Sequence, residues 1–367
     1  MMATTAAQST HICTRCILPD SIPGITFNAA GVCSLCQAEE ANHAPREKTG
    51  EQGFLDALAP RARSDAYDCL CLYSGGKDST FMLYLLSKVM KLRVLAMTLD
   101  NWFISPQTYT NINRTLQKLG NVDHLMVKPS WSTVQKMFQA GFSFQRGTQL
   151  GDKAYMMGHA CYSCFGLICI HAGQIATNKG IRNIVLGTTP GQLTQKSVDR
   201  PGERFESASE GFRSTIWPLM KEMARRDDSF RHWTRLSPLR FIRARRLRMV
   251  PLYEYVSYNE ADIYRTVESE LGWVRPKDTD SCSTNCQLNA VGIHVHRKLY
   301  QISPYTIPLA HDVRIGLLDR QEALDAVNAP VNAKIVTRIA AQLGLESMVA
   351  DLLPAAEARD SATACAE

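Results

Sequence analysis

The sequence lacks several features that would assign it at once to a special class of protein. We identify no apolar run of the roughly 20 residues that a membrane-spanning helix needs. Residues 1–10 are small and polar, without the apolar core of a signal peptide, so we expect a cytoplasmic protein that does not contact a membrane. There is no internal repeat and no G-x-x-x-x-G-K-[ST] motif, which excludes a Walker A phosphate loop.

Charge of either sign is also limited. Charged residues make up 21% of the chain and the formal net charge is +6. This mild excess agrees with an anionic partner, such as a nucleotide or RNA, without requiring one. The 367 residues, 45% of them hydrophobic, allow two domains and a small appended module.

Cysteine, in contrast, is abundant, with twelve residues. In a reducing compartment, spaced cysteines indicate metal binding or catalysis before they indicate disulfides. Three of them, Cys69, Cys71 and Cys169, stand in apolar surroundings and are predicted to be buried as small hydrophobic residues. Eight others form one group near the N-terminus and two later pairs: Cys13, Cys16, Cys33 and Cys36, then Cys161 with Cys164 and Cys282 with Cys286.

The N-terminal group has the spacing of two zinc knuckles. Two residues separate Cys13 from Cys16 and Cys33 from Cys36, and sixteen residues separate the two pairs. Four thiolates form a closed tetrahedral site for Zn²⁺, which would serve folding or docking because no coordination position stays open. Four unpaired thiols are the alternative, but they would leave so short a segment without a core. We predict a zinc-ribbon-like module over residues 1–45.

The chain is organised around residues 69–80. Apolar residues 69–73 predict a buried strand and residues 81–90 predict a helix. The turn between them contains two glycines, which permit a positive φ and a close approach of a ligand to the backbone. Residues 78–80 begin the helix, where free N–H groups favour an anion. The pattern predicts a phosphate-binding turn, with an ordinary helix cap as the alternative.

Strand-like and helix-like segments alternate over residues 66–200. Further strands are predicted at residues 92–99, 124–127 and 183–186, and helices at residues 111–119, 133–140 and 164–178. This alternation predicts an α/β fold with a doubly wound parallel sheet. Ligands bind such sheets at the carboxyl ends of the strands. The sequence therefore places four residues around one crevice, namely Ser74, Thr98, Asp100 and Gly187.

Residues 201–249 form an arginine-rich segment. Aromatic side chains, Phe230, Trp233 and Phe241, lie between the arginines. Such a segment can bind phosphates and stack on bases, and a solvated helical insertion is the alternative. The arginines are Arg225, Arg226, Arg231, Arg235, Arg240, Arg243, Arg245, Arg246 and Arg248.

Five regions are predicted in all. The module of residues 1–45 is followed by a linker helix over 46–65 and a catalytic domain over 66–290, which contains the insertion. Residues 291–353 form a helical C-terminal extension, and residues 354–367 a flexible tail.

The turn resembles the signature of the PP-loop family, the ATP pyrophosphatases, in Ser74, Gly75, Gly76, Lys77, Asp78 and Ser79. The resemblance implies a fold of the adenine nucleotide α-hydrolase type and an ATP site in which these residues hold the phosphates. Lys77 would add positive charge, and Asp78 would help to hold Mg²⁺. A substrate carbonyl would take AMP from ATP, and a nucleophile would then displace it. A non-catalytic nucleotide-binding protein is a further alternative, against which the intact loop argues.

One branch of this family is similar at the cysteines. The tRNA-thiolating enzymes with an iron–sulfur cluster use a C-x-x-C ahead of a helix and one later cysteine. Here the resemblance implies a [4Fe–4S] cluster on Cys161, Cys164 and either Cys282 or Cys286, with the first two acting in catalysis. The helix N-terminus would favour their thiolates. A second zinc on all four cysteines, or a redox pair carrying a persulfide, are the alternatives. The chain departs from these enzymes at Gly187-Thr188, where they commonly have Gly-His.

A second branch, the N-acetyl sugar amidotransferases of surface-polysaccharide synthesis, is similar at both ends of the chain. The matching residues are Ile17-Leu18-Pro19-Asp20, Pro23-Gly24-Ile25 and Phe27, then Val313-Arg314-Ile315-Gly316 and Arg320-Gln321-Glu322-Ala323. These enzymes take ammonia from a partner glutaminase, of which this chain has no motif.

Sulfur transfer to a nucleobase, in tRNA or in a small purine-like molecule, is the first prediction, with a sulfur-donor protein or sulfide as partner. Amide-nitrogen transfer is the alternative. We also expect a homodimer.

Overall fold

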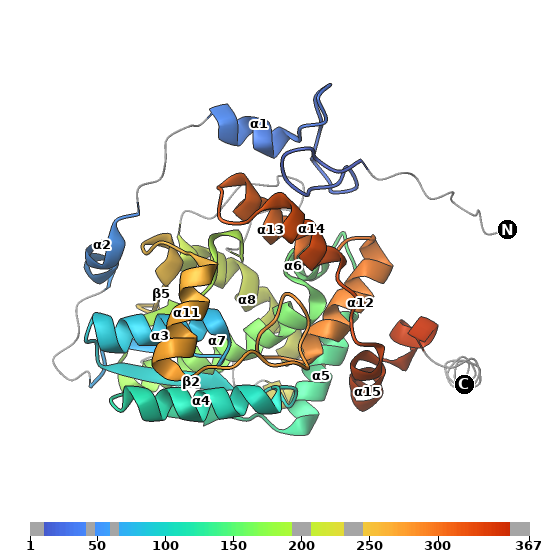
Figure 1. The fold of residues 1–367 in the computed structure, drawn as a ribbon. Coiled ribbons are helices and arrows are strands. Elements are labelled where there is room, and N and C mark those ends of the chain that lie inside the picture. The colour runs from blue at the N-terminus through green and yellow to red at the C-terminus, as the bar shows by residue number, and fades with distance from the viewer. Residues whose placement is uncertain (1–10, 42–47, 59–65, 193–206, 231–244, 353–367) are drawn as a thin grey trace.

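Residues 11–41, 48–58, 66–192, 207–230 and 245–352 are described by a computed structural model (Figure 1). Five parallel strands form one sheet in the order β3-β2-β1-β4-β5. The strands are β1 (Cys69–Leu72), β2 (Val94–Leu99), β3 (Asp123–Val127), β4 (Asn183–Leu186) and β5 (Arg248–Pro251). The α/β prediction is confirmed. The fifth strand was not predicted, because it is short and joins the arginine-rich segment to a proline.

Alternate residues of β1 face opposite sides of the sheet, as the strand geometry requires. Cys69 and Cys71 belong to one buried cluster, and Leu70 belongs to another on the opposite face. The first cluster includes residues of α3 (Lys77–Tyr84), α4 (Pro106–Leu119) and α11 (Glu260–Leu271). Helix α7 (His159–Lys179) covers the other face through Ala172 and Ala176. Cys69 and Cys71 are fully buried and Cys169 is 2% exposed, which confirms their expected place in the core.

Helix α7 corrects the expectation that no segment could cross a membrane. By length and composition it is apolar enough to do so. However, 56% of its apolar window is buried inside the protein, and α7 packs on β1, β2 and several helices. A helix that is apolar on all sides is typical of the centre of a large core.

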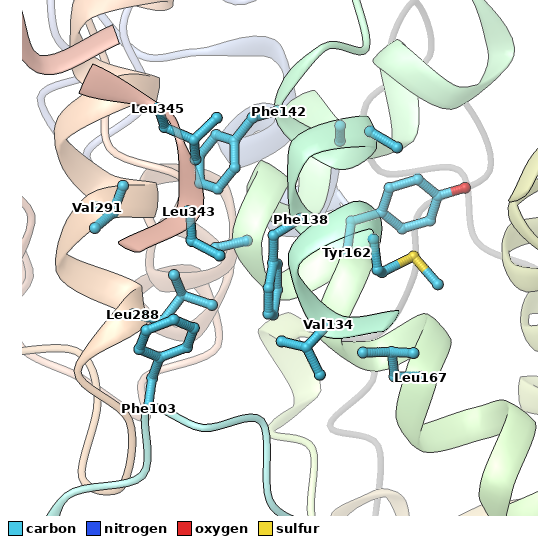
Figure 2. Packing of buried hydrophobic residues seen from close by; sticks show 14 of the residues in the cluster. Phe103, Val134, Phe138, Phe142, Tyr162, Leu167, Leu288, Val291, Leu343 and Leu345 are labelled. Carbon is cyan, nitrogen blue, oxygen red and sulfur yellow. The ribbon is translucent and has the colours of Figure 1, made fainter. Parts of the chain in front are cut away.

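The largest hydrophobic cluster joins α7 to the C-terminal part of the chain (Figure 2). Phe138 of α5 (Trp131–Phe142) lies between Tyr162 on α7 and Leu343 on α15 (Ala333–Leu343). Leu288 and Val291 add the start of α12 (Leu288–Tyr300) to the same core. The domain boundary expected at residue 290 therefore falls inside a helix, and the C-terminal region shares the core of the sheet domain.

The segment predicted as an insertion also contributes to this core. Helix α8 (Ala208–Arg226) buries Ile216, Leu219 and Met223, and Phe230 in the following turn is 1% exposed. Phe230 is thus a core residue and not a base-stacking one, and α8 is not a solvated helix. Arg225 and Arg226 both pair with Glu222. The arginines at 231, 235, 240 and 243, with Trp233 and Phe241, lie outside the described residues.

The remaining elements surround this frame. Asn259 caps α11, since its side chain accepts a hydrogen bond from the Asp262 N–H. Phe54 in the predicted linker helix is fully buried beside Tyr255, which fixes that helix to the sheet domain. The other helices are α1 (Ser34–Ala41), α2 (Gly50–Ala57), α6 (Gln149–Met157), α13 (Thr306–Arg314) and α14 (Arg320–Asn328); short helical turns are Leu85–Val89, Pro190–Gln192, Asp228–Phe230, Leu252–Glu254 and Glu346–Leu352.

Candidate functional site

The turn after β1 has the glycine geometry that the sequence predicts. Gly75 has φ +79°, and a Cβ there would lie 2.7 Å from side-chain carbons of Ile112 and Thr108. Its carbonyl accepts a hydrogen bond of 2.9 Å from the indole N–H of Trp273. Both the backbone conformation and the packing therefore require glycine at this position.

Hydroxyl groups hold the rest of the loop. The Ser74 and Ser79 hydroxyls are 3.0 Å apart, and Ser79 Oγ also lies 3.2 Å from the Ser74 N–H. The Lys77 N–H donates to Thr284 Oγ1 at 3.1 Å. The start of α3 thus contacts a segment more than 200 residues further along the chain, which sequence patterns did not connect to the loop.

The two charged residues of the loop form an ion pair with each other. Lys77 is 8% exposed, and its ammonium lies 2.8 Å from Asp78 Oδ1, 3.0 Å from the Tyr258 hydroxyl and 3.4 Å from Glu260 Oε1. Burial opposes the charge of Lys77, but the two carboxylates raise its pKa above the ordinary value. Asp78 lines the cavity described below, and both of its carboxylate oxygens accept from the Lys77 ammonium. Lys77 therefore neutralises Asp78.

Two of the four residues expected around the crevice do line it. Ser74 follows β1 and Gly187 follows β4, and these two strands are neighbours in the sheet. After β1 the chain continues to β2 on one side, and after β4 it continues to β5 on the other side. The two loops therefore diverge and open a crevice between them. The Thr98 hydroxyl instead lies 2.6 Å from the Tyr73 carbonyl, to which it donates. Asp100 accepts the Trp102 N–H and pairs with Lys128 at 2.9 Å. Thr98 and Asp100 stabilise the strand ends beside the crevice.

One cavity of about 430 Å³ joins the loop of residues 74–79 to the later cysteines. Its polar rim includes Ser74, Asp78 and Ser79, and side chains such as Met97 and Met249 give it an apolar floor. All four later cysteines line it: Cys161, Cys164, Cys282 and Cys286. The structure thus brings together groups that are separated by more than 200 residues in sequence.

The cysteine pair on α7 lies differently from the prediction. Helix α7 begins at His159, so Cys161 and Cys164 occupy its first two turns and neither precedes the helix. Burial, together with a smaller contribution from the nearby Cys286 sulfur, raises the pKa of Cys161 to about 12. Burial also raises the pKa of Cys164 and Cys286. Burial therefore favours the thiol form of these residues, and a bound cation would favour the thiolate form.

Cys286 is the later cysteine that belongs with this pair. The Asn101 amide donates to Cys164 Sγ at 3.5 Å and to Cys286 Sγ at 3.3 Å. Cys282 instead directs its sulfur to the Ala326 carbonyl at 3.7 Å. Asn101 lies two residues after the end of β2, where ligand-binding residues are expected, but its contacts depend on α7 and on residue 286 and are not visible in the sequence.

The N-terminal cysteines form a compact metal-binding group. Their sulfurs lie within 4.8 Å of one another, with 3.8 Å between Cys13 and Cys36 and 3.6 Å between Cys16 and Cys33. Zn–S bonds of about 2.3 Å at a tetrahedral ion place two sulfurs about 3.8 Å apart. The Cys33 N–H also lies 3.2 Å from Cys13 Sγ. The geometry fits one zinc ion.

The four-cysteine module is attached to the C-terminal helices (Figure 1). The Arg320 guanidinium donates to the Cys13 and Cys16 carbonyls, both at 2.9 Å. Arg314 approaches Cys16 Sγ at 3.8 Å. The two segments that resemble the sugar amidotransferases therefore meet in space, with Arg320 joining them.

A zinc-ligand substitution tests the module. Cys33→Ser is expected to reduce bound zinc from about one ion per chain to almost none and to lower the melting temperature, because metal binding and local folding are coupled. Cys71→Ala, a buried cysteine of β1, is the matched control and should keep its zinc. Zinc-free protein from zinc-replete cells would contradict the assignment. Metal analysis of the purified variants measures the zinc content, and thermal unfolding measures the melting temperature.

Comparison with known proteins finds similar chains among the solved structures. No family model matches the sequence, and no curated protein matches it. Among solved structures, the chain is similar to the U34-tRNA thiolase NcsA from Methanococcus maripaludis with its [4Fe–4S] cluster, at 15% identity. The alignment covers 90% of this chain and 97% of that chain, with a TM-score of 0.33. At this level of similarity the chemistry has to be inferred from the residues of this chain.

Proposed function

We propose that this protein is a PP-loop enzyme that activates a substrate carbonyl with ATP and replaces its oxygen with sulfur. The substrate would be a nucleobase, in tRNA or in a small purine-like molecule. One observation carries the proposal: the phosphate loop and four cysteines open into the same cavity of about 430 Å³. Such a cavity allows an activated carbon to form within reach of a sulfur source.

The loop residues would hold ATP. Backbone N–H groups of the loop and of the start of α3, other than those that donate to Ser79 and Thr284, would bind the phosphates. Asp78 faces the cavity and would hold Mg²⁺, an ion that prefers carboxylate and phosphate oxygens. Lys77 would limit the negative charge of Asp78, and Gly187 would allow the nucleotide close to the end of β4.

The reaction would proceed by two displacements. The substrate carbonyl oxygen attacks the α-phosphorus of ATP, and the bond to pyrophosphate breaks. Hydrosulfide then adds to the activated carbon, its proton is released, and the original oxygen leaves with AMP. The carbon ends with a C=S bond, and no electron is gained or lost. Sulfide or a sulfur-donor protein would supply the sulfur.

Three thiolates would hold a [4Fe–4S] cluster: Cys161, Cys164 and Cys286, in preference to Cys282. The Asn101 contact to two of these sulfurs supports this set. When bound through three cysteines, the cluster supplies one free iron that can bind sulfide.

Product analysis tests the reaction class. Protein purified without oxygen would be incubated with ATP, Mg²⁺ and either sulfide or ammonia. AMP and pyrophosphate are the expected products, with sulfur incorporation from sulfide. Formation of ADP and phosphate would contradict the proposal. Turnover with ammonia and an N-acetyl nucleotide sugar would support the amidotransferase alternative, which the contact between Arg320 and the module favours.

Salt dependence distinguishes the two substrate classes. If tRNA binds the arginine-rich segment, its affinity should fall steeply with salt, and Arg243→Ala with Arg246→Ala should reduce the slope by about two. Arg265→Ala, an exposed arginine on α11 that pairs with Asp262, is the control. Turnover that neither salt nor the double substitution changes would indicate a small purine-like substrate. A cytoplasmic location and a homodimer remain predictions of this proposal.

A further inference from the structure

Helix α13 lies between the four-cysteine module and the cavity. Ile307 and Ala310 share a buried cluster with Ile17, Leu18 and Ile22 of the module. The guanidinium of Arg320, at the start of α14, fixes the module backbone to this helical pair. One side of α13 is therefore covered by the module.

The other side of α13 contacts the loop that follows β4. Asp312 is 6% exposed, and its Oδ1 accepts the Gly191 N–H at 3.0 Å and lies 3.7 Å from His311 Nδ1. A Cβ on Gly191 would lie only 2.2 Å from the Pro308 carbonyl, so the loop and the helix are in direct backbone contact. Helix and loop are thus joined by packing and by a charged hydrogen bond.

This loop forms part of the cavity wall. Gly187, Thr188, Gly191 and Gln192 line the cavity, and so does Pro308 of α13. The loop is held internally by the Thr189 N–H, which donates to Gln192 Oε1 at 3.1 Å. Its position decides the shape of the crevice at the point where the loops of β1 and β4 diverge.

We propose that Arg320 and Asp312 are positioning residues that connect the four-cysteine module, through α13, to the loop of residues 187–192. The module would thus set the wall of the nucleotide crevice from outside it, without contacting ATP. The part of this proposal that concerns ATP rests on the proposed function, and the part that concerns the loop does not.

The physical basis is the short length of α13. A helix of nine residues is marginal alone in water, so its position depends on what packs against it. Removing the Arg320 contacts weakens the packing of the module against one side of α13. Removing the Asp312 carboxylate leaves the buried Gly191 N–H without its acceptor, which costs more than an exposed hydrogen bond.

Hydrogen exchange tests the connection in the full chain without any nucleotide. Asp312→Ala and Arg320→Met are expected to speed exchange in residues 187–192 by about tenfold, as the loss of a hydrogen bond to a charged group predicts. Exchange in β1 should not change. Asp312→Asn retains an acceptor oxygen and should behave as wild type. Arg265→Met, which replaces an exposed arginine on α11, should also behave as wild type.

Affinity for a fluorescent ATP analogue is the second measurement. Both test variants should bind it several-fold more weakly while keeping their zinc. Faster hydrogen exchange with unchanged ATP affinity would support the connection between the module and the loop of residues 187–192, and would show that this connection does not affect nucleotide binding. Exchange that stays at the wild-type rate in Arg320→Met, with zinc present, would overturn the proposal, as would equal acceleration in all of the chain.

Discussion

Replacement of Gly76 with valine is expected to lower ATP-dependent AMP formation by about a hundredfold or more, the effect of removing an aligned backbone donor. Gly76 lines the cavity between Ser74 and Thr284. Even a Cβ would lie 2.9 Å from Thr284 Oγ1, so the bond from the Lys77 N–H to that oxygen would be disturbed. The branched side chain would also occupy the space in which a phosphate would bind.

Gly173→Ala is the matched control for this substitution. Gly173 lies in α7, where the nearest atom to a new Cβ is Leu247 Cδ1 at 3.9 Å. Alanine should fit there and should stabilise the helix by about 0.5–1 kcal/mol. AMP and pyrophosphate would be measured beside the melting temperature of each variant. If folded Gly76→Val protein formed AMP at the wild-type rate, the proposal that this loop binds the phosphates of ATP would be wrong.

The second large effect is expected at the cavity cysteines. Protein purified without oxygen should be brown, with about four irons per chain. Cys161→Ala, Cys164→Ala and Cys286→Ala should each lose iron and sulfur transfer. Cys282→Ala should keep most of both, because the Cys282 sulfur lies against the Ala326 carbonyl, away from Asn101.

Cys169→Ala controls for the loss of a buried thiol. Cys169 lies on the same helix as Cys161 and Cys164, is 2% exposed and belongs to the hydrophobic core. Its substitution should leave the iron content unchanged. Iron and zinc analysis and the absorption spectrum decide the outcome. A colourless protein with two zinc ions per chain would exclude the cluster, and the amidotransferase alternative would then be the better supported function.

Features set by neighbouring residues could be predicted from the sequence. A strand, two glycines and a helix start are contiguous at residues 69–80, so the turn could be predicted without the rest of the fold. The spacing of Cys13 to Cys36 similarly indicated one metal site, whose sulfurs do meet. The buried face of α8 also had a readable signal, because Ile216, Leu219 and Met223 follow a helical period, but the surrounding arginines obscured it.

The contacts that complete the site could not be read in this way. Thr284 meets the Lys77 N–H across 207 residues, and Asn101 meets Cys286 across 185. The choice of Cys286 over Cys282 depends on which of two nearby sulfurs faces Asn101. Their spacing from Cys161 and Cys164 carries no such information.

The sequence by itself determined most of the elements, the glycine turn and the number of cysteines available to metals. Only the tertiary structure decided which later cysteine lies beside Asn101 and Cys164, and that α13 connects the module to the cavity wall. Local conformation depends on the φ and ψ preferences of adjacent residues, which single-residue patterns record. Long-range contact depends on how whole faces pack, where many small dispersion and burial energies sum over residues that are far apart in the chain.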